Sequence, residues 1–218
     1  MTLLRRLSAL LAVLALAGSI GVTFLIAPLV YASSLGPNFP TTCIDDASVG
    51  GNAWTSPGNE VSSNNSYATA TAGSTSFSRT HFLNCQGFGF AIPSGATING
   101  IVLEAEASTT ISGKVYASTV KLIKGGTVSG NDLGATTPTL NNTDAFFTYG
   151  TATELWGLAW TDPDVNASNF GGVISYQYNA TGSQTVLADS MRITVYYTAA
   201  AGGGTVSQTR QVQIISIF

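Results

Sequence analysis

The only histidine in the sequence, His81, is the one residue on which a Ser-His-Asp arrangement could be built. It lies in the alternating run Arg79–Leu83, which predicts a β-strand, and no Gly-x-Ser-x-Gly motif accompanies it. We therefore interpret His81 as an ordinary strand residue, and we expect no catalytic residues.

Two glutamates, Glu104 and Glu106, are the best candidates for paired-carboxylate chemistry. They stand two positions apart in a predicted strand and so share one face. Paired carboxylates serve in glycoside hydrolysis, which makes an exported hydrolase one hypothesis. Such a pair is also typical of a solvated strand face, where Lys114 or Lys121 could compensate its charge, and we favour this interpretation.

A short acidic segment is the best candidate for a metal site. Its oxygens alternate along the chain as in a calcium loop, and the candidate ligands are Asp162, Asp164 and Asn166. The EF-hand pattern then fails, because alanine and valine stand where glycine and glutamate are required. Turn formation and helix capping explain the same residues. No cofactor is therefore expected, with calcium as the one candidate, and Asp45, Asp46 and Asp189 are weaker ligand candidates.

The aromatic side chains raise the question of carbohydrate binding. Three tryptophans, eight tyrosines and ten phenylalanines are present, and most of them must fill the core. Exposed tryptophans could stack on a sugar, and the candidates for this are Trp54 and Trp160.

The two cysteines, Cys43 and Cys85, are an even pair in a chain that carries an export signal. We predict a structural disulfide between them, worth about 4 kcal/mol on the chain-entropy model. Their spacing fits neither a redox motif nor a metal-ligand motif.

The composition limits the partners and the location of the protein. Its 218 residues include 8 Lys+Arg and 11 Asp+Glu, so only 9% are charged and no basic surface for nucleic acid can form. Residues 1–32 predict a signal peptide, with Arg5-Arg6 before an apolar stretch and cleavage after Ala32. A retained hydrophobic helix is the alternative. Both interpretations indicate a secreted or cell-surface protein.

Residues 33–198 predict an all-β domain, an antiparallel β-sandwich with jelly-roll-like connections, preceded by the N-terminal signal or anchor helix. A barrel is the competing fold. Short alternating runs rich in Val, Ile, Thr and aromatic residues lie between Gly, Asn, Ser and Pro clusters. The predicted strands are residues 66–72, 77–84, 87–92, 100–107, 114–124, 145–149, 172–178, 185–188 and 191–198.

Three stretches carry a resemblance to known sequences. They are Phe88–Val102 with IPSGATI-GI, Leu155–Gly171 with LWG-W, and Ile193–Thr198 with VYYT. Together, residues 50–198 resemble a poorly characterised group of β-sandwich domains in bacterial surface proteins and phage virion-associated proteins. The resemblance implies a sandwich fold and brings no catalytic residue set with it.

The C-terminal residues differ in composition from the domain. Residues 199–204 form a Gly/Ala linker, and 205–218 predict a strand. This strand could fold back as an edge strand, or it could add to the sheet of a neighbouring subunit. The candidate self-assembly residues are Val206, Val212, Ile214, Ile215, Ile217 and Phe218.

These features predict an exported, non-catalytic structural protein. We expect a homo-oligomeric or polymeric subunit of an extracellular filament, pilus-like fibre, sheath or layer, assembled by strand addition. A carbohydrate-binding, lectin-like surface module is the alternative, with glycans as partners. A virion-associated structural protein is a weaker alternative.

Overall fold

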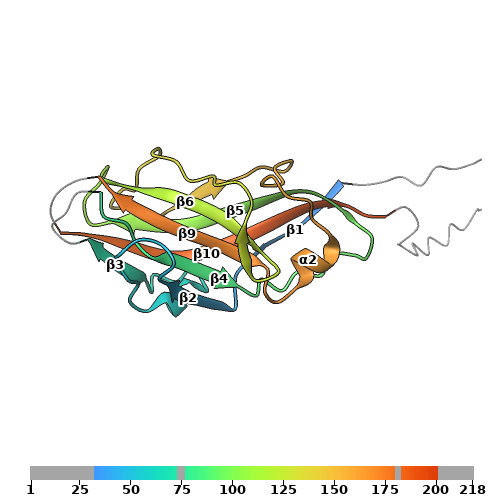
Figure 1. The fold of residues 1–218 in the computed structure, drawn as a ribbon, viewed down its shortest axis with the longest axis horizontal. Helices are drawn as coiled ribbons and strands as arrows, with labels where there is room; N and C mark the ends of the chain where they lie inside the picture. Colours follow the sequence, from blue (N-terminus) through green and yellow to red (C-terminus); the bar gives the residue numbers. More distant parts are fainter. Residues whose placement is uncertain (1–31, 73–76, 180–182, 201–218) are drawn as a thin grey trace, which may run out of the picture.

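The computed structural model describes residues 32–72, 77–179 and 183–200, which form two antiparallel sheets packed face to face (Figure 1). Sheet A contains β1 (Ala32–Asn38), β3 (Ala68–Ala72), β5 (Thr97–Thr109), β8 (Ala145–Tyr149) and β10 (Gln184–Thr198). Sheet B contains β2 (Thr42–Asp46), β4 (Phe82–Gln86), β6 (Val115–Lys124), β7 (Thr127–Ser129) and β9 (Gly171–Tyr178). Two short helices, η1 (Pro57–Glu60) and α2 (Asp162–Asn166), lie in the connections.

The strand order is that of a jelly roll with two additions. Sheet A contains the path β3-β10-β5-β8, and sheet B contains β4-β9-β6-β7. This is the two-Greek-key connectivity of eight-stranded sandwiches. Strand β1 pairs with the second half of β10, beside β3, and β2 extends sheet B by pairing with β4. The predicted antiparallel sandwich is confirmed, whereas the predicted N-terminal helix lies outside the described residues.

The core lies between the sheets and follows from the alternation in each strand. In β10, Met191, Ile193 and Val195 point inward and are fully buried. Each such side chain contributes about 1.5–3 kcal/mol through burial. The layers approach closely at Gly172 of β9, because a Cβ there would lie 2.3 Å from Leu103 Cδ1 of β5.

The predicted strand at residues 87–92 is not formed. Gly87 and Gly89 have φ values of 78° and 64°, outside the extended region that a strand needs. Phe88 and Phe90 nevertheless pack into the core, where both meet Phe170 edge-on. Residues 87–92 thus keep the alternating burial of a strand although they form no β ladder.

Other element boundaries also differ from the prediction. The runs 185–188 and 191–198 form one strand, β10, joined through a β-bulge between Ala188 and Ser190. Strands β1, β2 and β7 were not predicted, because their residues alternate only in part. No helix within the described ranges is long and apolar enough to cross a membrane.

The predicted disulfide is confirmed. Cys43 of β2 and Cys85 of β4 stand directly opposite each other in the strand pair, with an S–S distance of 2.05 Å. Both residues are buried. The bond therefore fastens the added strand β2 to the jelly roll.

Candidate functional site

His81 has a structural environment. Its Nδ1 lies 2.9 Å from Asp45 Oδ2, and its carbonyl accepts the indole N–H of Trp54 at 3.0 Å. Asp45 also accepts the backbone N–H of Trp54. These contacts hold β2 against the start of β4. Strand β4 does not include the predicted strand residue His81, which stands between the bridge at Thr80 and the first residue of β4.

Glu104 and Glu106 share the outer face of sheet A as predicted, but their partners are on β10. Arg192 donates to Glu104 through Nε at 2.8 Å and Nη2 at 3.0 Å. Ser190 Oγ donates to Glu106 Oε2 at 3.0 Å. The Arg192 guanidinium also lies over the Phe146 ring, 3.6 Å from its centroid. The pairing with Lys114 or Lys121 is therefore replaced by a cross-strand ladder, and the two carboxylates are engaged in it.

The candidate calcium ligands at α2 are all engaged in hydrogen bonds. Asp164 Oδ2 accepts from the Thr161 backbone at 2.9 Å and from Thr161 Oγ1 at 2.7 Å, which completes a capping box. Asp162 Oδ1 accepts from the Gly95 N–H, and the Asn166 amide binds both backbone groups of Ile92. The capping interpretation accounts for these residues.

The charge of Asp164 is compensated as well. Burial alone would raise the pKa of Asp164, but the hydrogen bonds from Thr161 and the ammonium of Lys124, 3.1 Å away, outweigh it and lower the pKa below its ordinary value. In the described part of the chain, no three or more His, Cys, Asp or Glu side chains form a group that could hold a metal ion.

The two candidate stacking tryptophans are buried. Trp54 is 5% exposed and Trp160 is 8% exposed, and both indole N–H groups donate to backbone carbonyls. Trp160 packs edge-on against Phe170. Neither ring offers a free face to a sugar, because the sandwich needs both for its core.

The candidate self-assembly strand lies outside the described residues. Val206, Val212, Ile214, Ile215, Ile217 and Phe218 all belong to residues 201–218. Assembly through this strand stays a prediction.

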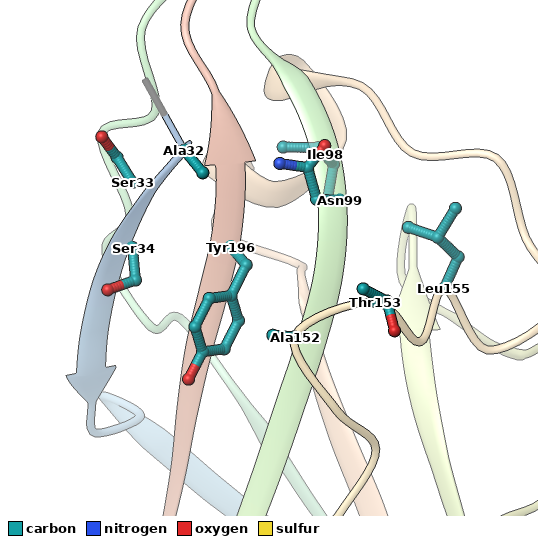
Figure 2. A pocket seen from close by; sticks show the side chains of 9 residues that line it. All are labelled: Ala32, Ser33, Ser34, Ile98, Asn99, Ala152, Thr153, Leu155 and Tyr196. Carbon is teal, nitrogen blue, oxygen red and sulfur yellow. The ribbon is translucent and has the colours of Figure 1, made fainter. Parts of the chain in front are cut away.

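A pocket of about 670 Å³ opens over one end of sheet A (Figure 2). It lies where β1 begins, β5 begins and β10 ends, and the loop after β8 closes one side. Its lining residues are Ala32, Ser33, Ser34, Ile98, Asn99, Ala152, Thr153, Leu155 and Tyr196. We name it the Tyr196 pocket.

The shape of the Tyr196 pocket depends on a glycine and a change of register. Tyr196 pairs with Gly100, whereas Tyr197 pairs with Ile98, so Asn99 is the extra residue of a bulge in β5. A Cβ on Gly100 would lie 2.3 Å from the carbonyl carbon of Ala152. Only glycine therefore allows the loop after β8 to cross the strand at this point.

The Tyr196 ring stands in the pocket between Ser34 on β1 and Ala152 in the loop (Figure 2). Ser34 is its cross-strand partner in the β1–β10 pair. On the other side of the ring, Asn99 donates to Thr198 Oγ1 at 2.8 Å, which fixes the orientation of its amide. The result is one aromatic ring surrounded by hydroxyl, amide and small apolar groups.

This pocket was not predicted from the sequence. The alternation in residues 191–198 did place Tyr196 on the face opposite Met191, and this is the signal that was present. The pocket itself needs β1, which was not predicted, and the loop that crosses Gly100.

No protein family model matches the chain, and no curated protein matches its sequence. Among solved structures, the chain is similar to a CBM4 structure, with 18% identity over 61% of this chain and 85% of that chain, at a TM-score of 0.32. It is also similar to the N-terminal cellulose-binding domain of Cellulomonas fimi β-1,4-glucanase C, with 16% identity, 72% and 89% coverage and a TM-score of 0.34. Likeness of this size does not say what this chain binds.

Proposed function

We propose that the protein is a carbohydrate-binding module and that the Tyr196 pocket is its binding site. The single observation that carries this proposal is the tyrosine ring in a pocket of about 670 Å³, with serine, threonine and asparagine side chains around it. This volume lies in the usual range of small-molecule sites, about 300–1,000 Å³.

The chemistry of the pocket suits a sugar. A pyranose ring has an apolar C–H face, which can pack on an aromatic ring, and a rim of hydroxyl groups. Tyr196 would supply the ring, while Ser34, Asn99 and Thr153 would supply hydrogen-bond donors and acceptors. None of the nine lining side chains is charged, which favours a neutral glycan.

The strands that carry the pocket residues also favour binding. Ser34, Asn99 and Tyr196 lie on three adjacent strands, β1, β5 and β10, whose pairing limits their movement. A site on paired strands is ordered before the ligand arrives, so less conformational entropy is lost on binding.

A panel of neutral oligosaccharides and soluble polysaccharides, titrated by calorimetry and by NMR, tests the proposal. We expect Tyr196→Ala to weaken binding by about tenfold or more, because one aromatic contact is worth about 1 kcal/mol beyond its buried area. Tyr116→Ala, on β6 of sheet B, is the matched control and should bind as the native protein does. Absence of glycan binding by the native protein, or unchanged binding by the Tyr196 variant, would contradict the proposal.

No contact among the described residues favours the predicted structural subunit over glycan binding. It depended on residues 205–218, which the structure does not describe. It therefore stays a prediction beside the proposal.

A further inference from the structure

A second pocket lies on the outer face of sheet B. It has a volume of about 240 Å³ and opens over β2 and β4, which run side by side at one edge of the sheet (Figure 1). Its lining residues are Thr41, Thr42, Ile44, Asn84, Gln86 and Ser168. We name it the Gln86 pocket. Ligand sites usually have volumes of about 300–1,000 Å³, so this smaller pocket suits one small group rather than a chain.

The alternation of β2 and β4 directs the lining side chains away from the core. Cys43 and Cys85 point inward, where they form the buried disulfide. Their neighbours in each strand therefore point outward. The outward residues form two cross-strand pairs, Thr42 with Gln86 and Ile44 with Asn84. Strand pairing thus fixes the positions of four of the six lining residues.

A chain of hydrogen bonds orients the two amides of the pocket. Gln86 Nε2 donates to Asn84 Oδ1 at 2.9 Å, and Asn84 Nδ2 donates to Asp46 Oδ2 at 3.2 Å. Because an ionised carboxylate only accepts hydrogen bonds, Asp46 determines which way both amides point. These bonds leave Gln86 Oε1 and one N–H of each amide free of other described residues.

Asp46 stays ionised, so it remains an acceptor at neutral pH. Burial alone would raise the pKa of Asp46, but hydrogen bonds from Ser48 and Asn84 outweigh it and lower the pKa below its ordinary value. The orientation of the amides is therefore set before a ligand arrives, which reduces the entropy lost on binding.

Hydroxyl groups complete the polar lining, from Thr41, Thr42 and Ser168. The backbone N–H of Thr41 donates to the carbonyls of Gln86 and Gly87, at 3.1 and 3.2 Å, which fastens this residue to the end of β4. A Cβ on Gly87 would overlap with Thr41 Oγ1, so a glycine at this position leaves the hydroxyl its place.

Ile44 adds an apolar surface to these polar groups. Its side chain is 49% exposed and stands opposite Asn84 in the strand pair. A branched aliphatic side chain suits a methyl group of a ligand. Among the described residues, no aromatic side chain lines the Gln86 pocket, so a sugar ring has no stacking platform there.

We propose that the Gln86 pocket binds the acetamido group of a 2-acetamido sugar. Such a group has one N–H donor, one carbonyl acceptor and one methyl group. Gln86 Oε1 would accept the N–H, a free amide N–H or a hydroxyl of the pocket would donate to the carbonyl, and Ile44 would contact the methyl group. The lining hydroxyls would bind the hydroxyls of the sugar. None of the six lining side chains is charged, which disfavours an anion or a metal ion.

The Gln86 pocket is separate from the Tyr196 pocket. One opens over β2 and β4 of sheet B, and the other over β1, β5 and β10 of sheet A. The acetamido proposal therefore does not depend on glycan binding by Tyr196, and each proposal can fail alone.

NMR titration of the native protein with N-acetylglucosamine tests the proposal, and glucose is the matched probe because it differs only in the substituent at C2. We expect a Kd on the order of 1 mM for N-acetylglucosamine, as for a ligand of this size at ordinary ligand efficiency. The Ile44 methyl signals and the side-chain amide signals of Asn84 and Gln86 should shift with N-acetylglucosamine and stay in place with glucose.

Two variants test the assigned contacts. Gln86→Met keeps the length of the side chain without its amide, and it should weaken binding by about tenfold. Ile44→Thr removes the apolar contact from an exposed position and should weaken binding by about fivefold. Ile111→Thr is the matched control, because Ile111 is 46% exposed in the turn between β5 and β6, and it should bind as the native protein does.

Three results would overturn the proposal. They are no shift at the Gln86 pocket, equal shifts there with glucose, and unchanged binding by both Gln86→Met and Ile44→Thr. Tighter binding of an N-acetylated dipeptide than of N-acetylglucosamine would overturn it as well, because the ligand would then be a peptide amide.

Discussion

Two acidic segments of this protein differ in how far their carboxylates are compensated. At α2, the oxygens of Asp162 and Asp164 accept hydrogen bonds from Gly95 and Thr161, and Lys124 compensates part of the charge. At η1, Glu60 is fully buried and neither of its oxygens has a partner among the described residues.

The difference teaches that the spacing of acidic residues does not show which carboxylate is compensated. Alternating carboxylates in the sequence indicated α2, but its capping box already uses them. A single glutamate after Pro57-Gly58-Asn59 gave no such pattern, yet it has the larger uncompensated charge. Unsatisfied burial, rather than the spacing of acidic residues, shows which carboxylate lacks a partner among the described residues.

The largest expected effect comes from Glu60 and concerns the pH dependence of the free energy of unfolding, measured in the presence of a chelator. Because the pKa of Glu60 is raised on folding, its contribution to stability is complete below the ordinary value of 4.5 and is lost as the pH rises toward the raised value. We expect Glu60→Gln to equal the native protein near pH 4 and to exceed it by about 2–3 kcal/mol at neutral pH.

Urea unfolding from pH 4 to 8 measures this difference directly. Parallel curves for the native protein and Glu60→Gln would show that Glu60 is compensated within the fold. The contrast between the two acidic segments would then disappear.

A smaller effect is expected from Asn166→Ala on the α2 side. The Asn166 amide accepts the N–H of Ile92 at 2.8 Å and donates to its carbonyl at 2.9 Å, and Ile92 is only 3% exposed. Loss of both bonds should lower the free energy of unfolding by about 1–2 kcal/mol. The decrease should be the same in chelator and in calcium, since this segment needs no ion.

Asn169→Ala is the control for that change. Asn169 is exposed, and its side chain has no hydrogen-bond partner among the described residues, so its loss should leave the free energy of unfolding nearly unchanged. A calcium-dependent effect of Asn166→Ala would restore the metal hypothesis at α2.

The smallest effect is expected from Thr161→Ala. This change removes the N-cap side chain of α2 and should cost about 0.5–1 kcal/mol in urea unfolding. It should also raise the pKa of Asp164, because Thr161 hydrogen bonds hold that pKa low. An NMR titration of the Asp164 carboxyl checks this, and an unchanged pKa would assign the shift to the backbone N–H of residue 161 and to Lys124.

The fold could be predicted in outline because its main signals are local. The alternation in residues 191–198 predicted which side chains lie on each face of the second half of β10. The predicted strand 145–149 has the same bounds as β8. Strands β1, β2 and β7 could not be predicted in this way. They form because strands already paired in the sheets offer them a free edge, which a local pattern does not contain.

The candidate site was less predictable than the fold. Aromatic content suggested sugar binding, but it directed attention to Trp54 and Trp160, which the core requires. The Tyr196 pocket forms where three strands and a loop meet over Gly100. No single stretch of sequence includes these parts.

By itself, the sequence determined an antiparallel β domain and the Cys43–Cys85 disulfide. Side-chain alternation and an even pair of cysteines depend only on residue type and order. Tertiary structure alone decided that Glu60 is buried beside Asp189 and that Tyr196 stands in a pocket. Whether a side chain is buried, and whether it finds a hydrogen-bond partner, depends on segments that are distant in the chain. These properties therefore exist only once the two sheets have packed.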